Sequence, residues 1–247
     1  MNKNIENLKL QSLDLSFQSM KPFVFYKKWF HQYCDNEEIP EEIAILEQFF
    51  TKINAVHGWT VVEKTTPLLI DWLIHDGPLN GFLFLLKQGF DPNKGSELFN
   101  GKALNIALQK KREPKLIEQL LAYGADVNDV DKVFKRTPLI LASMFYPEWI
   151  EALLEKGASV NARDHSSWTA LHWAIFQNPE GIDPLLRYGA DLNVVPEGYS
   201  NILEFALKNG EGESFFLVQK YLAIREKEKL SERIPDSQNT VKKQTFI

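Results

Sequence analysis

A short turn peptide recurs four times along this chain at nearly constant spacing. The copies read GFDPN at 89–93, GADVN at 124–128, GASVN at 157–161 and GADLN at 189–193. Their closing asparagines lie 35, 33 and 32 residues apart. A period near 33 residues predicts a stacked array of small units, each unable to bury its apolar face alone. Because the product of such an array is an extended surface, we consider binding before chemistry.

Each unit carries the signals of two short helices, and the third copy shows them most clearly. Thr137 can cap a helix with its hydroxyl, and Pro138 suits the first helical position, where a missing N–H costs nothing. Pro147 can open a second helix, and Gly157 can end it in the left-handed conformation that glycine adopts easily. Residues 158–161 then predict a turn that leads into an extended finger.

The same order of signals recurs from 102 to 128 and from 169 to 193, more loosely from 66 to 93, and again from 201 without a closing turn. This pattern resembles the ankyrin repeat, whose signature is a Thr-Pro-Leu-His-x-Ala helix start and a Gly-Ala-Asp-Val-Asn turn. The resemblance covers about residues 65–225. It implies antiparallel helix pairs stacked side by side, with fingers projecting from one edge. The expected fold class is an all-α ankyrin-repeat solenoid of about four to five repeats.

Two positions within the repeats carry expectations of their own. His172 alone fills the histidine position of the ankyrin signature, and we expect it to be a structural hydrogen-bonding group with Trp173 packed beside it. Pro184 falls inside the second helix of the fourth unit and is expected to shorten or kink that helix.

The ends of the chain predict caps for the array. Residues 1–64 lie outside the periodic pattern and contain two expected helices, at 22–34 and 40–56, which would cover the first repeat as an N-terminal helical cap. Residues 214–229 predict a longer helix whose charged outer half suits a C-terminal capping helix. The expected domains are therefore a cap region (1–64), the repeat array (65–225), and the end of the capping helix with a disordered polar tail (226–247).

Composition narrows the environment and the partners. The net charge of -5 argues against a nucleic-acid partner, because affinity for phosphates rests on Lys and Arg. The same charge fits a basic protein partner, and it fits solubility equally well. Cys34 is the only cysteine, so no internal disulfide can form and a reducing compartment is expected. We find no secretory signal and no apolar run of about 20 residues, which predicts a cytoplasmic protein without membrane contact. Export by a specialised secretion system remains open.

No motif in the sequence predicts catalysis. The five histidines form no metal-site spacing, one cysteine cannot supply a structural zinc centre, and no phosphate-cradling glycine loop occurs. His31 and Cys34 could face each other one helical turn apart, but two neighbours on an amphipathic face explain them as well. We therefore expect no enzyme activity, no cofactor and no metal. The alternative is an enzyme or modifier with its site in residues 1–64 and the array as its targeting arm.

Candidate binding residues come from the positions that ankyrin-like arrays expose, which are the finger tips and the far ends of the first helices. Fingers usually favour small or polar residues, whereas four of these fingers carry an aromatic ring. A row of rings beside an arginine has the composition of a binding hot spot and predicts a contact ridge centred on the third and fourth repeats. The alternative is that the rings fold over neighbouring repeats. The predicted partner-binding residues are Phe99, Phe134, Arg136, Met144, Phe145, His165, Trp168, Phe176, Gln177 and Tyr199.

These features together predict a non-enzymatic protein-binding module, monomeric when free, that presents its concave face and finger tips to one partner. The role suggested by fold and charge is that of an inhibitor, such as an immunity-type neutraliser of a toxin or enzyme. A secreted effector, an adaptor or a self-assembling array are the alternatives.

Overall fold

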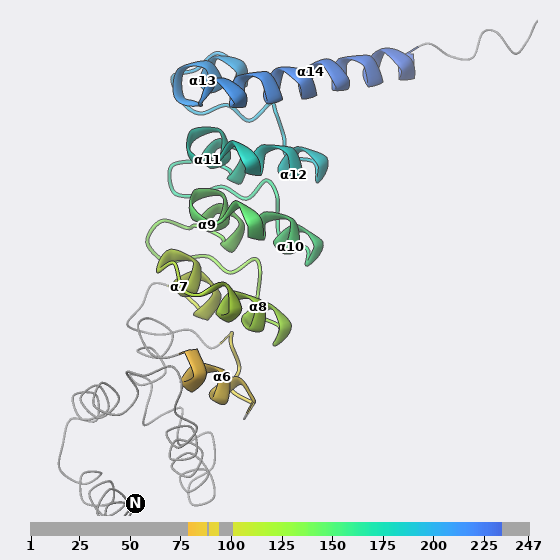
Figure 1. Ribbon diagram of the computed structural model, residues 1–247. Helices are drawn as coiled ribbons and strands as arrows, with labels where there is room; N and C mark the ends of the chain where they lie inside the picture. Colours follow the sequence, from red (N-terminus) through yellow and green to blue (C-terminus); the bar gives the residue numbers. More distant parts are fainter. Residues whose placement is uncertain (1–78, 88, 94–100, 234–247) are drawn as a thin grey trace, which may run out of the picture. The chain divides into compact units, whose positions relative to one another are not determined.

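The computed structural model describes residues 79–87, 89–93 and 101–233 of the 247-residue chain. Within these ranges the regular structure is helical and contains no strand, as the repeat pattern predicts. The elements in chain order (Figure 1) are α6 (Leu79–Lys87), α7 (Ala103–Gln109), α8 (Pro114–Ala122), α9 (Pro138–Phe145), the 3-10 turn η1 (Pro147–Trp149), α10 (Ile150–Glu155), α11 (Ala170–Gln177), the 3-10 turn η2 (Pro179–Gly181), α12 (Ile182–Arg187), α13 (Ile202–Asn209) and α14 (Gly212–Arg233).

The chain divides into two compact units, Met1–Lys132 and Val133–Ile247. In the described part of the first unit, α8 packs against both α7 and α6. Phe82 and Leu86 on α6 and Leu116 and Leu120 on α8 are buried, so these helices share an apolar core. A single helix pair is too small to bury its own apolar stripe, so the repeats stack on one another.

The second unit contains three helix pairs, α9 with α10, α11 with α12, and α13 with α14 (Figure 1). Neighbouring pairs pack through like helices, α9 against α11 and α10 against α12, and α14 also packs on α12. Side-chain hydrogen bonds join the pairs at their helix ends. The Asn178 amide donates to the carbonyls of Ser143 and Met144 at 2.9 and 2.8 Å, and the Ser214 hydroxyl donates to the carbonyl of Ile175 at 3.1 Å. These bonds satisfy carbonyls that the ends of α9 and α11 would otherwise leave unpaired.

The local signals of the third repeat act as predicted. Thr137 caps α9, because its hydroxyl accepts a hydrogen bond from the Ile140 N–H at 3.3 Å, and Pro138 occupies the first helical position. Pro147 opens the 3-10 turn that leads into α10. Gly157 follows the end of α10 with φ of 86°, the left-handed region that favours glycine.

The recurring asparagine of the turn peptide has a physical role that explains the period. In the second unit the Asn161 amide donates to the Gly189 carbonyl at 3.3 Å, and its oxygen accepts from the Asp191 N–H at 2.8 Å. In the first unit Asn93 makes the same pair of bonds one repeat onward, to Gly124 and Asp126. Asn93 and Asn161 therefore each fasten their own turn to the equivalent turn of the next repeat, which explains why this side chain recurs with the repeat.

The prediction for Pro184 was wrong. Pro184 is the third residue of α12, where a backbone N–H has no partner within the helix, so its missing donor breaks no bond. The helix α12 has 6 residues, as does α10, which carries no proline. The proline therefore does not make its helix shorter than the equivalent helix of the preceding repeat.

At the C-terminal end, the longer helix predicted for 214–229 is present as α14, which has 22 residues. In Figure 1 its C-terminal half extends past the end of α13. The two helices expected in residues 1–64, and the tail from 234 onward, lie outside the described residues. The domain boundaries at 64 and 225 stay predictions.

Candidate partner-binding surface

Two fingers of the second unit, residues 133–136 and 163–168, lie next to each other and are held by backbone bonds. The His165 N–H donates to the Phe134 carbonyl at 2.7 Å, which joins one finger to the other. Lys135 and Ser167 have φ of 54° and 63°, so each finger turns sharply at one residue. Within the second finger the Asp164 N–H donates to the Trp168 carbonyl at 2.9 Å. These bonds fix the positions from which the finger side chains project.

Asp164 is the centre of the second finger. Its carboxylate is buried and accepts three hydrogen bonds, from the Ser166 N–H at 2.8 Å, the Trp168 N–H at 3.0 Å and the Trp173 indole N–H at 2.9 Å. Because Trp173 lies on α11, the third bond ties the finger to the helix behind it. The sequence interpretation missed this residue. Its signal was an aspartate three places after the closing Asn161, an offset that Asp131 also has after its own closing asparagine.

Aromatic rings fill the space between the fingers and the first helices. The Trp168 ring centroid lies 4.9 Å from that of Trp173, 5.8 Å from Phe176 and 5.2 Å from Phe205. Tyr199 meets Phe205 edge-on at 5.1 Å. Such tilted and edge-on contacts stabilise ring clusters by about 0.5–1.5 kcal/mol per pair beyond area burial. The cluster therefore forms a rigid base that spans the fourth and fifth repeats.

At its outer rim the cluster opens to solvent. Phe134 and Phe176 are each 44% exposed, whereas Phe205 is fully buried. The Arg136 guanidinium carbon lies 4.3 Å from the Phe134 ring centroid and 5.5 Å from that of Trp173, which continues the row across the first finger. Trp168 and Tyr199 are half-buried. The alternative reading, in which rings fold over neighbouring repeats, thus holds in part for these two, since Phe205 of the next repeat covers them.

His172 lies beneath this surface as a buried structural group. Its Nδ1 accepts from the Thr169 N–H at 2.9 Å, and its Nε2 lies 3.0 Å from the Val194 carbonyl, so the neutral ring with its proton on Nε2 satisfies both partners. Burial lowers the pKa of His172 below its usual value of 6.5. The imidazole therefore holds the start of α11 against the third finger of the second unit, residues 194–200, which confirms the structural role predicted for it.

The sequence model of ankyrin repeats matches residues 104–195 in three copies. Residues 104–195 of this chain are ankyrin repeats. His172, Thr137 and Asn161, whose structural roles are described above, lie within this region. Ankyrin repeats are protein–protein interaction modules, and so this chain carries such a module.

Curated relatives share the ankyrin region. The chain is 37% identical over 118 residues to ankyrin repeat and SOCS box protein 6 of Homo sapiens, a match over 44% of this chain and 28% of that protein. It is 35% identical over 125 residues to a putative ankyrin repeat protein of Rickettsia bellii, which covers 48% of this chain and 46% of that protein. It is also 37% identical over 92 residues to glycerophosphocholine phosphodiesterase gde1 of Schizosaccharomyces pombe, covering 37% of this chain and 8% of that protein. The chain thus spans less than half the length of each of these relatives.

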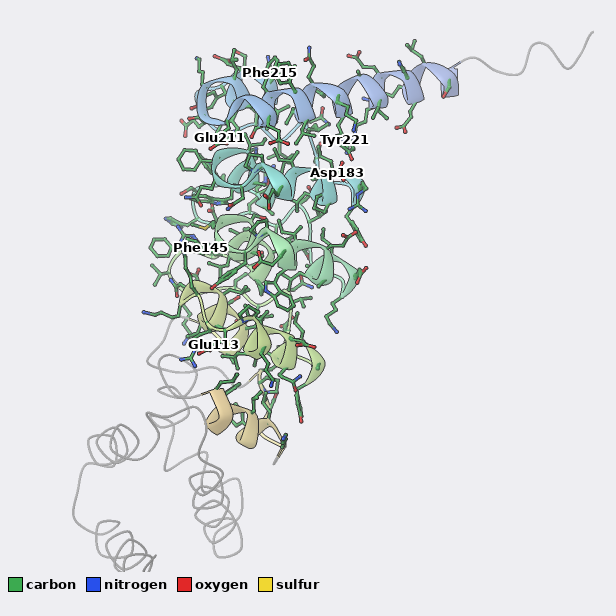
Figure 2. The ribbon with its side chains drawn as sticks, viewed as in Figure 1. Glu113, Phe145, Asp183, Glu211, Phe215 and Tyr221 are labelled. Carbon is green, nitrogen blue, oxygen red and sulfur yellow. The ribbon has the colours of Figure 1, made fainter. Side chains whose placement is uncertain are left out.

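The predicted contact residues differ in how far their side chains are exposed. Met144 is only 9% exposed, because it lies on the buried face of α9, so we leave it out of the candidate surface. Phe145 ends α9 half-exposed, and its ring stands away from the ribbon in Figure 2. Gln177 and His165 are exposed, and Phe99 lies outside the described residues. We define the finger surface by its described members, which are Phe134, Arg136, Phe145, His165, Trp168, Phe176, Gln177 and Tyr199.

Two opposite charges on α13 form an ion pair. Lys208 Nζ lies 2.6 Å from a Glu204 carboxylate oxygen, and the second oxygen accepts from the Ser200 N–H at 2.8 Å. These two donors lower the pKa of Glu204 to about 2. The Tyr221 hydroxyl of α14 donates to the Asp183 carboxylate of α12 at 2.6 Å (Figure 2). This hydrogen bond lowers the pKa of the Asp183 carboxyl. Glu204 is therefore satisfied within its own repeat, whereas Asp183 joins α12 to α14.

Among the described residues, no group of three or more His, Cys, Asp or Glu side chains could hold a metal ion. The longest of the described helices is too polar to cross a membrane, and the others are too short. The described geometry offers a rigid aromatic surface with basic side chains, which suits recognition of another macromolecule.

Proposed function

We propose that the finger surface is the site at which this chain binds a partner protein, without catalysing a reaction on it. The observation that carries the proposal is the exposed rim formed by Phe134 and Phe176 above a fully packed base. Aromatic side chains beside an arginine dominate the energetics of many protein interfaces. Because the fingers are already fixed by the bonds of Asp164 and His165, few side chains need ordering on binding, which favours affinity.

The role we propose is inhibition, in which the bound partner is a toxin or an enzyme whose own contact surface becomes covered. Support comes from the extent and rigidity of the finger surface, which runs over three successive repeats of the second unit. A rigid surface of this kind blocks access by steric cover and needs no chemical step on the partner.

A second candidate is a targeting or adaptor role for the array. It is favoured by the relatives, since regions similar to this array occupy 28% of ankyrin repeat and SOCS box protein 6 and 8% of the phosphodiesterase gde1. In that case residues 1–64, which lie outside the described part, would hold a separate activity that the array brings to its target.

The test compares capture of partner proteins by the full chain and by its variants. The chain is immobilised, exposed to host-cell extract, and the retained proteins are identified by mass spectrometry and then purified. We expect the Phe134→Ala/Phe176→Ala variant to weaken binding of a retained partner by about thirtyfold if one ring is a hot spot and by about a thousandfold if both are, since a hot-spot side chain contributes about 2 kcal/mol. The matched control is Phe216→Ala on α14, because Phe216 is 67% exposed and lies outside the finger surface.

Equal binding by the double variant and the original chain would refute the proposed surface, as would an equal loss in the Phe216→Ala control. Melting temperatures of all three proteins show whether a loss reflects unfolding. Adding the chain to the purified partner then separates the two roles, because loss of the partner's activity supports inhibition and unchanged activity supports targeting.

A further inference from the structure

The exposed charges of the two central fingers are basic, although the chain as a whole carries -5. Lys135, Arg163 and His165 are exposed, and Arg136 is half-buried against Phe134. Within the described part of the chain neither Lys135 nor Arg163 forms an ion pair. The one carboxylate of these fingers, Asp164, is buried and already accepts three hydrogen bonds. A molecule that approaches the fingers therefore meets positive charge.

The acidic residues of the same unit gather elsewhere. Four glutamates are exposed on η1, α10 and η2, which belong to the second helices of two repeats. Lys156, at the end of α10, is also exposed and carries the opposite charge. Arg187 of α12 also lies there, but it pairs with Glu151 and Asp183 at 3.0 Å each. Those exposed glutamates are Glu148, Glu151, Glu155 and Glu180. Within the second unit, the exposed charges of the two fingers are therefore basic and those of η1, α10 and η2 are mainly acidic.

Two exposed aromatic rings adjoin the basic side chains of the fingers. Phe134 and Phe176 are each 44% exposed, and both contact members of the ring cluster or its cationic rim. Only at the third finger does the sign change, where Glu197 is exposed. A complementary ligand would therefore present carboxylates to the first two fingers and a large apolar side chain to the exposed rings.

We propose that the finger surface recognises an acidic segment of its partner protein that also carries an aromatic or large aliphatic residue. Carboxylates of the segment meet Arg163, Lys135 and Arg136, and the apolar side chain packs between Phe134 and Phe176. This inference rests on the proposed function and gives its partner a chemistry. It reverses the expectation of a basic partner, because total charge says nothing about where the charges lie. The acidic second-helix side disfavours the other polyanion, a nucleic acid.

The test selects peptides from a displayed random library, each of about 12 residues, against the immobilised full chain. We expect the enriched peptides to be acidic with at least one large apolar residue, and their binding to weaken as salt is raised. Arg163→Glu should reduce their affinity at least about tenfold. The matched control is Lys156→Glu, which changes the net charge equally but lies at the end of α10, and it should leave the affinity unchanged.

Enrichment of neutral or basic peptides overturns the inference, and if those peptides lose binding in Phe176→Ala, the proposed surface itself stands. If no enriched peptide depends on Phe176, both the inference and the proposed function fail. Single-stranded RNA is added as a competitor, and displacement of the peptides by RNA at lower concentration than by free acidic peptide would also overturn the choice of a protein partner.

Discussion

Replacing Asp164 by Asn tests whether one buried carboxylate holds the second finger in place. The change keeps the shape of the side chain and removes its charge. One amide oxygen can still accept from the Ser166 and Trp168 N–H groups, which bind the same carboxylate oxygen at 2.8 and 3.0 Å. The amide NH2 group then faces the Trp173 indole N–H at the place of a 2.9 Å bond, and two donors oppose each other.

The expected destabilisation follows from that single lost bond. A hydrogen bond to a charged group contributes about 1.5–3 kcal/mol, and Trp173 is half-buried, so water compensates part of the loss. We therefore expect the free energy of unfolding to fall by about 2 kcal/mol. The finger would lose its tie to α11, and binding of a partner should weaken with it.

Urea unfolding is followed by circular dichroism, and it gives the free energies for a double-mutant cycle with Trp173→Phe when all variants show the same dependence of unfolding free energy on urea concentration. Because each single change removes the same bond, the double variant should be more stable than the sum of the single losses predicts, by about 1–2 kcal/mol. Additive losses within about 0.5 kcal/mol, or an Asp164→Asn protein as stable as the original, would show that this bond does not hold the finger.

Three further predictions concern the array. Asn161→Ala should lower the free energy of unfolding by about 1–3 kcal/mol, because both bonds to the next repeat are lost. Asn193→Ala should cost less, because the Asn193 amide bonds to Asp191 within its own turn. Chemical denaturation of the two variants checks this, and equal losses would contradict it. Gly210→Ala should destabilise the protein by about 1–3 kcal/mol, since a Cβ at Gly210 would lie 2.8 and 3.0 Å from two backbone carbonyl oxygens. A Cβ at Gly212 would have no such neighbour within 4 Å, so Gly212→Ala should be neutral or stabilising. Equal changes in the melting temperatures of the two variants would refute this. Burial lowers the pKa of His172, so the unfolded chain binds the proton more tightly than the folded chain. The stability that the neutral ring contributes is complete above about pH 6.5 and falls below that pH by at most about 1.4 kcal/mol per pH unit. The difference in unfolding free energy between the original chain and His172→Gln, measured from pH 7.5 to 5, should therefore shrink on acidification, and a constant difference would contradict the assignment.

The repeat architecture was accessible from the sequence because its signals act over short distances. The cap of Thr137, the proline at the start of α9 and the left-handed glycine after α10 each depend on a few neighbouring residues. The same locality explains the error at Pro184. Its effect depends on its exact position within a helix, and the start of α12 after a 3-10 turn could not be located from the pattern alone.

The chain's sequence by itself determined that helix pairs repeat, where each pair turns, and that an asparagine closes each turn. Tertiary structure alone decided which side chains reach solvent. Trp168 and Tyr199 are partly covered by Phe205 of the following repeat, Met144 is buried, and Asp164 is neutralised by donors from its finger and from α11. The physical reason is range: a cap or a turn is made by adjacent residues, whereas exposure and local charge also depend on side chains that other elements, such as α11 and α13, bring near.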